Sequence, residues 1–329
     1  MTLPLHKFLH LVAGAAALPA LSYFAWAQAY PTRPVTMVVT FAPGGANDTV
    51  ARILSSQMGE ALGQSLIVEN VTGASGTTGT LHVAKSTPDG YQFVLRDNGT
   101  FAINQTAQKR PLYNALTDFE PVGLIAELPL LLATRKDLPV DNLGEFIAYA
   151  KANQTRMQYG SAGVGTGPHL ACVMLSSAIG VDVTHITYRG GGPAMQDLIA
   201  GRIDYLCPII TTALPQIEGE KVKVIANLGK NRSSFLPNLA SAHEQGLDVD
   251  ANFWLAFFLP KGTPAPIVNR LHDAFVAAIE SPSVKARMRE VGTEVVSRER
   301  RSPEYLQKFV ESEIEKWAGP IKASGVSMD

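Results

Sequence analysis

The feature that most constrains the fold is a repeated order of elements: an apolar strand, a glycine-rich loop and an amphipathic helix. The order occurs at residues 35–62 and again at 157–175. Residues 35–41 (VTMVVTF) are β-branched and lie between two prolines, which is typical of a strand buried on both faces. A helix that connects two neighbouring strands implies a crossover and hence parallel pairing. The pattern therefore predicts an α/β protein built from two such units.

Each of the two units has a glycine-rich loop between its strand and its helix. The first is the turn Pro43-Gly44-Gly45, after which Asn47 is predicted to cap a helix that ends at Gly63. The second covers residues 160–168 (GSAGVGTGP), and a helix follows from His169. Ligands of open α/β sheets bind beyond the carboxyl ends of the strands. If the two units face each other, loops 41–48 and 160–169 therefore line one cleft.

The remaining elements follow the same alternation, and the length of the chain fits two domains. Strands are predicted at 92–96, 183–187, 203–207 and 222–227, with a turn at 97–100 and a helix opened by Pro193. Helices with a hydroxyl cap are predicted after Thr263 and Ser302, each before a proline. The 329 residues exceed the usual size of one domain.

The first 29 residues have the three parts of a secretory signal peptide. His6 and Lys7 give a weakly basic start, a mostly apolar stretch follows at 8–26, and Ala-Gln-Ala closes the segment at 27–29. The alternative is a membrane anchor, since the stretch is near the length that spans a bilayer. Pro19 and the small residues at the end favour cleavage between Ala29 and Tyr30. The exported chain is then expected in the periplasm.

Composition excludes several classes of protein. The 28 basic and 29 acidic residues nearly balance, which rules out the strong positive charge of a nucleic-acid binder. The two cysteines, Cys172 and Cys207, show no zinc-ligand spacing. They could be buried thiols, but an even number in an exported chain favours a disulfide.

The chemistry available to the two loops is that of the main chain. Glycines allow close approach, and the N–H groups of a helix's first turn suit an anion such as a carboxylate or phosphate. A tight turn without a ligand is an equally good interpretation of either loop. Neither loop has the phosphate-loop ending Gly-Lys-Ser/Thr or the Gly-x-Ser-x-Gly pattern of hydrolases, and no His-Glu-x-x-His occurs.

Three polar residues near these loops have two interpretations each. His169 either hydrogen-bonds a ligand or caps its helix. Asp48 is better explained by a favourable position at a helix N-terminus than by acid–base catalysis. Asp204 closes a strand pattern and could equally be a surface or hinge residue.

Nine segments of the chain match the pattern of a known family: AYPTRPVTMVVTFAPGGANDTVARILSSQMGEALGQSLIVEN, STPDGYQFVL, NGTFAIN, TDFEPVGLIAELP, YGSAGVGTGPHLA, VTHITYRGGGPAMQDLIAGRID, LPNLASAHEQGL, FFLPKGTPAPIVNRL and EIEKWAGPIKASGV. In these segments the chain resembles the Bug (TctC-type) family, the periplasmic solute receptors of tripartite tricarboxylate transporters. It spans nearly all of the exported chain. It implies a two-lobed periplasmic binding protein (type II-like), each lobe a mixed, mostly parallel sheet flanked by helices, that closes on a small carboxylate.

The resemblance also implies the lobes and the ligand-binding residues. Lobe one would comprise 30–127 plus 256–329 and lobe two 128–255, with hinges within 124–134 and 252–259. The implied ligand contacts are Phe41, Ala42, Pro43, Gly44, Gly45, Asp48, Asn98, Thr100, Ser161, Ala162, Gly163, Gly165, Thr166, His169, Tyr188 and Asp204. Many relatives have an aspartate where this chain has Pro208. Simple dicarboxylates are therefore expected to bind better than amino acids of matching length.

The function expected from these observations is that of an extracytoplasmic receptor for a di-, tri- or aromatic carboxylate. It would deliver the ligand to the membrane permease subunits of a tripartite tricarboxylate transporter, as a monomer and without a cofactor or metal. Two other functions remain open. One is a ligand sensor that presents its closed form to a signalling partner, and the other is a carboxylate-processing enzyme on the same scaffold, for which no catalytic motif is recognisable.

Overall fold

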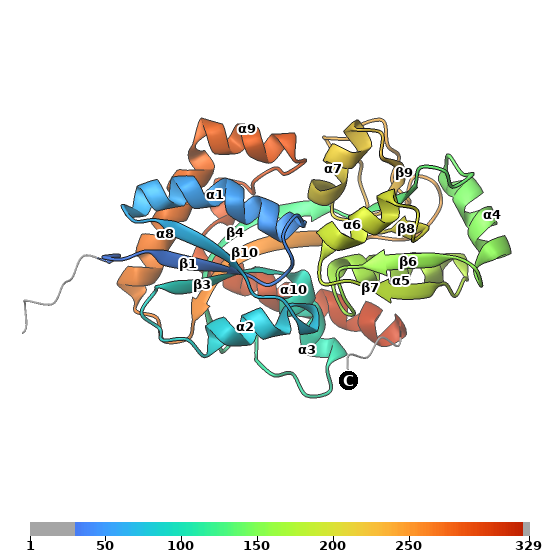
Figure 1. Ribbon diagram of the computed structural model, residues 1–329. Helices are drawn as coiled ribbons and strands as arrows, with labels where there is room; N and C mark the ends of the chain where they lie inside the picture. The colour runs from blue at the N-terminus through green and yellow to red at the C-terminus, as the bar shows by residue number, and fades with distance from the viewer. Residues whose placement is uncertain (1–29, 325–329) are drawn as a thin grey trace, which may run out of the picture.

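The computed structural model describes residues 30–324, so the expected signal peptide lies outside the described residues. Two five-stranded sheets lie side by side, each flanked by helices (Figure 1). None of the helices within residues 30–324 combines the length and the apolar character that a bilayer crossing needs.

The first sheet has the strand order β2-β1-β3-β10-β4. Its strands are β1 (Val35–Val39), β2 (Leu66–Asn70), β3 (Gln92–Asp97), β4 (Phe119–Pro129) and β10 (Asn252–Pro260). β10 pairs antiparallel with both of its neighbours, and the other four strands share one direction.

Helices cover both faces of this sheet because its strands are apolar on both faces. Met37 and Val39 of β1 belong to the core beneath α1 (Ala46–Leu62) and α8 (Ala265–Glu280), whereas Val38 belongs to the opposite core. That second core contains residues of α2 (Thr77–Ala84) and α10 (Pro303–Ser324) (Figure 1). The remaining helices of this half are α3 (Asn104–Ala107) and α9 (Pro282–Glu290).

The second sheet repeats the plan in the order β7-β6-β8-β5-β9, with β5 as the reversed strand. Its strands are β5 (Leu131–Arg135), β6 (Gln158–Ser161), β7 (Thr184–Thr187), β8 (Tyr205–Leu206) and β9 (Val222–Asn227). Its helices are α4 (Leu143–Asn153), α5 (Gly167–Ile179), α6 (Gly191–Ile199) and α7 (Ile210–Glu218). The predicted α/β class with two mixed, mostly parallel sheets is confirmed.

The chain passes between the sheets at two adjacent places. It leaves the first sheet at Leu130, between β4 and β5, and returns through residues 228–251, between β9 and β10. The Leu228 N–H donates to the Leu130 carbonyl at 2.8 Å, and the Ala251 N–H donates to the Leu228 carbonyl at 2.8 Å. The two crossing segments are therefore hydrogen-bonded to one another. In addition, α10 of the first half packs against α5 of the second.

Two predicted helix caps are wrong and one is confirmed. Gly45, not Asn47, is the N-cap of α1, and Asn47 lies inside its first turn. The Thr263 hydroxyl donates to the Pro260 carbonyl at 2.7 Å instead of capping α8. Ser302 does cap α10, since its hydroxyl oxygen accepts from the Tyr305 N–H at 3.1 Å.

The turn predicted at 97–100 is also wrong. The backbone is helical from Asn98, and a short π-helix (Gly99–Ile103) leads into α3. The Asp97 carboxylate accepts a hydrogen bond from the Thr100 N–H at 3.2 Å. An acidic side chain that accepts from the first turn favours a helix start over an isolated turn.

Candidate functional site

A narrow cavity of about 30 Å³ lies between the two sheets. The first half contributes Phe41, Gly45, Ala46, Asn47, Asp97 and Phe253, and the second contributes Gly160, Ser161, Ala162, Thr166, Pro168, Gly191, Ala194, Leu206, Cys207, Pro208, Ile209 and Thr212. A ligand here must be small and must contact both walls.

Three helices begin at this cavity. α1 begins after Gly45, α5 begins after its cap Thr166, and α6 begins after Gly190. A Cβ atom on Gly45 would lie 3.6 Å from the main-chain nitrogens of both Gly191 and Gly192, so the starts of α1 and α6 nearly touch. First-turn N–H groups lack intrahelical acceptors and lie at the positive end of the helix dipole. Their convergence makes the cavity favourable for an anion.

The lining supplies this positive potential without a basic side chain. No lysine or arginine lines the cavity within the part of the chain that the structure describes. Main-chain donors can hold an anion without the desolvation cost of a buried cation. The chemistry expected from the two glycine-rich loops is therefore available at one place.

The loops of the two halves touch directly beside the cavity. The Ala42 N–H donates to the Arg189 carbonyl at 3.0 Å. A Cβ atom on Gly192 would lie 2.7 Å from the Pro43 carbonyl oxygen, and one on Gly163 would lie 2.6 Å from the Ser75 hydroxyl. Gly163 also has φ = +130°, which side-chain-bearing residues rarely adopt. Glycine at these positions allows the two halves to come this close.

Of the sixteen residues expected to contact a ligand, five line the cavity, five more belong to the same two loops, and six do not line it. The five are Phe41, Gly45, Ser161, Ala162 and Thr166. Ala42, Pro43, Gly44, Gly163 and Gly165 belong to the same two loops beside it. The six expected residues that do not line the cavity all have polar side chains: Asp48, Asn98, Thr100, His169, Tyr188 and Asp204.

Asp48 is buried and takes part in an ion pair with the half-exposed Arg52 of α1. Its carboxylate accepts hydrogen bonds from Arg52, from the Gly44 N–H and from Asn70. Burial alone would raise the pKa of Asp48, but these hydrogen bonds, led by that of Arg52, hold the pKa below its ordinary value. The role is to fix the Gly44 turn and the start of α1, as the helix-terminus interpretation predicts.

Four other expected residues are engaged within the protein. Asn98 donates to the Asn252 carbonyl at 2.9 Å. The Thr100 hydroxyl donates to the Asp97 carboxylate at 3.1 Å. The Tyr188 hydroxyl donates to Asp197 at 2.8 Å, and Asp204 forms an ion pair with Arg135 at 3.0 Å. In this structure all four side chains are therefore bonded to other residues of the protein.

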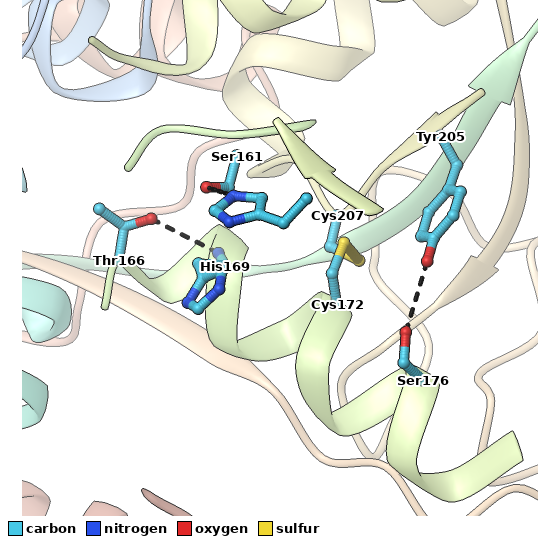
Figure 2. Close-up of a disulfide and its surroundings, with 8 residues drawn as sticks. Ser161, Thr166, His169, Cys172, Ser176, Tyr205 and Cys207 are labelled. Carbon is cyan, nitrogen blue, oxygen red and sulfur yellow. Dashed lines mark hydrogen bonds between the residues drawn. A yellow bond between two sulfur atoms is a disulfide. The ribbon is translucent and has the colours of Figure 1, made fainter. Parts of the chain in front are cut away.

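His169 supports the second loop from below (Figure 2). Its Nδ1 accepts from the Gly165 N–H at 3.2 Å, and its own N–H donates to the Thr166 cap. Its ring lies 4.4 Å from that of His185, whose Nε2 lies 2.7 Å from the Ser161 hydroxyl. The two imidazoles therefore hold Ser161 and the loop from the side away from the cavity.

Stability should depend on pH through this histidine pair. Burial, with a smaller effect of His185, lowers the pKa of His169 to about 3, and burial also lowers the pKa of His185. An unfolded histidine titrates near 6.5, so below that pH the unfolded chain binds protons that the folded chain does not. The free energy of unfolding should fall as pH drops from 6.5 towards 3, by up to roughly 1.4 kcal/mol per pH unit for His169.

Urea unfolding at pH 7, 6 and 5 measures this slope. His169→Gln should flatten it, whereas His243→Gln, on an exposed side chain, should leave it unchanged. Equal slopes in wild type and His169→Gln would contradict the assignment.

A disulfide joins Cys172 of α5 to Cys207, directly after β8, with Cα atoms 5.5 Å apart (Figure 2). Cys207 lines the cavity, and α5 begins at it. The cross-link therefore fixes the start of α5 relative to the floor formed by residues 206–209.

Sequence reasoning missed several lining residues. The sequence predicts Asn47 as a helix cap and Asp97 as part of a turn, so neither is expected to line the cavity. Gly191 and Thr212 come from the starts of α6 and α7. A usable signal was present in Gly190-Gly191-Gly192-Pro193, a third glycine-rich helix start that resembles the first two.

The comparisons with known proteins agree with this geometry. The family profile described as "Tripartite tricarboxylate transporter family receptor" matches residues 50–326. The solved structure of the periplasmic binding protein BugD is 38% identical, covers 91% of this chain and 99% of its own, and superposes with a TM-score of 0.88. MatC from Rhodopseudomonas palustris, solved with malate, is 35% identical over 89% of this chain and all of its own, with a TM-score of 0.86.

A further R. palustris protein, solved with adipate, is 32% identical over 91% of this chain and 99% of its own, with a TM-score of 0.86. The family is one of solute receptors, not of enzymes. The profile covers most of the chain, and the fold, the cleft and the relatives agree. The chain belongs to the TctC (Bug) family of periplasmic solute-binding receptors of tripartite tricarboxylate transporters.

Proposed function

We propose that this receptor holds a small dicarboxylate in the cavity between its sheets and delivers it to the permease of a tripartite transporter. The observation that carries the proposal is the convergence of three helix N-termini on a cavity that no lysine or arginine lines in the described chain. The relatives solved with malate and adipate support a dicarboxylate, because both ligands carry two carboxylates on a short chain.

The main-chain donors of loops 41–48 and 160–169 would hold one carboxylate of the ligand. The hydroxyls of Ser161 and Thr166 and ordered water would add further hydrogen bonds to it. The start of α6 adds a third set of donors, which the sequence interpretation did not include.

The two halves would move about the crossing segments at Leu130 and 228–251. In this proposal, the first sheet with its helices forms one lobe and the second sheet with its helices forms the other. The chain works as an exported monomer after removal of residues 1–29. The direct contacts between Ala42 and Arg189 and between Pro43 and Gly192 are contacts of the closed form.

A thermal-shift screen of the exported chain against mono-, di- and tricarboxylates tests the ligand class. A dicarboxylate at 100 times its Kd should stabilise the protein by about 2.7 kcal/mol, and the uncharged diamide of the same length should give no shift. Stabilisation by neutral sugars or amides, with none by any dicarboxylate, would contradict the proposal.

A further inference from the structure

Within residues 30–324, Asp97 is the one acidic residue that lines the cavity. It is the last residue of β3, and its side chain faces the start of α1, where Asn47 also lines the cavity. The residue is 1% exposed. A buried carboxylate in a site for anions needs a specific explanation, because two like charges in a poorly solvated space repel strongly.

Neutral donors bind three of the acceptor positions of this carboxylate. Its Oδ1 accepts from the Thr100 N–H at 3.2 Å and from the Thr100 hydroxyl at 3.1 Å, and the hydroxyl hydrogen is shared with the Asp97 carbonyl at 3.2 Å. Its Oδ2 accepts from the Asn47 amide at 2.8 Å. An ionised carboxylate offers about four acceptor positions. One position therefore remains, on Oδ2.

Arg96, the residue before Asp97, does not place its positive charge in the cavity. Arg96 points to the other face of β3, where it donates to the Gly76 carbonyl at 3.3 Å and to the Tyr113 hydroxyl at 3.4 Å. The group of a ligand that lies beside Asp97 must then be a hydrogen-bond donor. A second carboxylate at that place would be repelled.

The number of free acceptor positions distinguishes between two kinds of donor. An ammonium group carries three N–H donors, each of which needs an acceptor once water is excluded. A hydroxyl carries one. A single remaining position on Oδ2 matches a hydroxyl.

We propose that Asp97 accepts a hydrogen bond from a ligand hydroxyl, so that the receptor prefers hydroxy-dicarboxylates to unsubstituted dicarboxylates of the same length. The inference rests on the proposed function and narrows its ligand class. Many relatives have an aspartate where this chain has Pro208. In this chain Asp97, which lines the cavity from the other half, provides a carboxylate instead.

Calorimetry with malate (both enantiomers), succinate and aspartate tests the proposal, since the three share a four-carbon chain. Wild type should bind one enantiomer of malate at least about tenfold more tightly than succinate, as expected for a hydrogen bond to a charged group. Asp97→Asn keeps the shape of the side chain but places an N–H donor at the Oδ2 position. In this variant the malate-to-succinate ratio should fall to about one, with succinate binding retained.

Retained succinate binding also shows that Asp97→Asn folds and closes. Asp141→Asn, the same change at an exposed carboxylate paired with Lys223, is the matched control and should keep the wild-type ratio. Equal binding of malate and succinate by wild type, tighter binding of aspartate than of malate, or an unchanged ratio in Asp97→Asn would each overturn the proposal. Failure of all dicarboxylates to bind wild type would instead overturn the proposed function.

Discussion

Gly192→Ala should weaken ligand binding by about 10- to 100-fold without destabilising the ligand-free protein. The added Cβ would lie 2.7 Å from the Pro43 carbonyl oxygen and 3.0 Å from the Gly44 carbonyl carbon, both main-chain atoms of the opposite half. Overpacking against atoms that cannot rotate away costs about 1–3 kcal/mol. In the proposed movement the two halves meet at this contact only when they close, so the cost falls on closure. The ligand-free protein should not be destabilised, because Gly192 lies in the helical first turn of α6, where alanine is favoured over glycine.

Calorimetry with the best dicarboxylate and a ligand-free melting curve separate the two effects. Gly144→Ala is the matched control, since it also lies in the first turn of a helix of the second half, with the Asn142 side chain as its nearest neighbour at 3.4 Å. Its affinity should equal that of wild type. Wild-type affinity in Gly192→Ala would show that binding does not need this contact between the halves.

Replacing both cysteines with alanine should lower the free energy of unfolding of the second half by roughly 3–4 kcal/mol. Cys172 and Cys207 are 35 residues apart in the sequence, and their cross-link restricts the unfolded chain over that loop. The link also fixes the start of α5 beside the cavity. Ligand affinity should therefore fall together with stability.

Urea unfolding of the wild type with and without a thiol reductant measures the same effect independently. Reductant should lower the unfolding midpoint of wild type to that of the double variant and leave the variant unchanged. A double variant with the wild-type midpoint would contradict the stabilising role.

The sequence predicts the fold well because the information is local. Each strand is a short apolar run, each loop is marked by glycine, and the two-residue period of β1 places Met37 and Val38 in the cores on opposite faces of the sheet. The reversed strands β5 and β10 carry no such mark. Their direction depends on the two crossings between the sheets, which connect residues distant in the sequence.

The candidate site is less predictable for the same reason. Loops 41–48 and 160–169 are recognisable by composition, but Asp97 and Thr212 reach the cavity only through the packing of whole elements. Asp48 illustrates the opposite case. It lies at the end of the first loop, yet its buried side chain hydrogen-bonds Arg52 and Asn70 and does not line the cavity.

The main-chain donors at the cavity separate attraction from selection. Because an N–H group belongs to every residue except proline, most substitutions in the loops leave the attraction for a carboxylate in place. The side chains of Leu206, Pro208, Ile209, Thr212 and Asp97 can then change which molecule is accepted. Exchange of these side chains is consequently the direct route to a receptor with a new ligand, and the affinity for acids should persist through it.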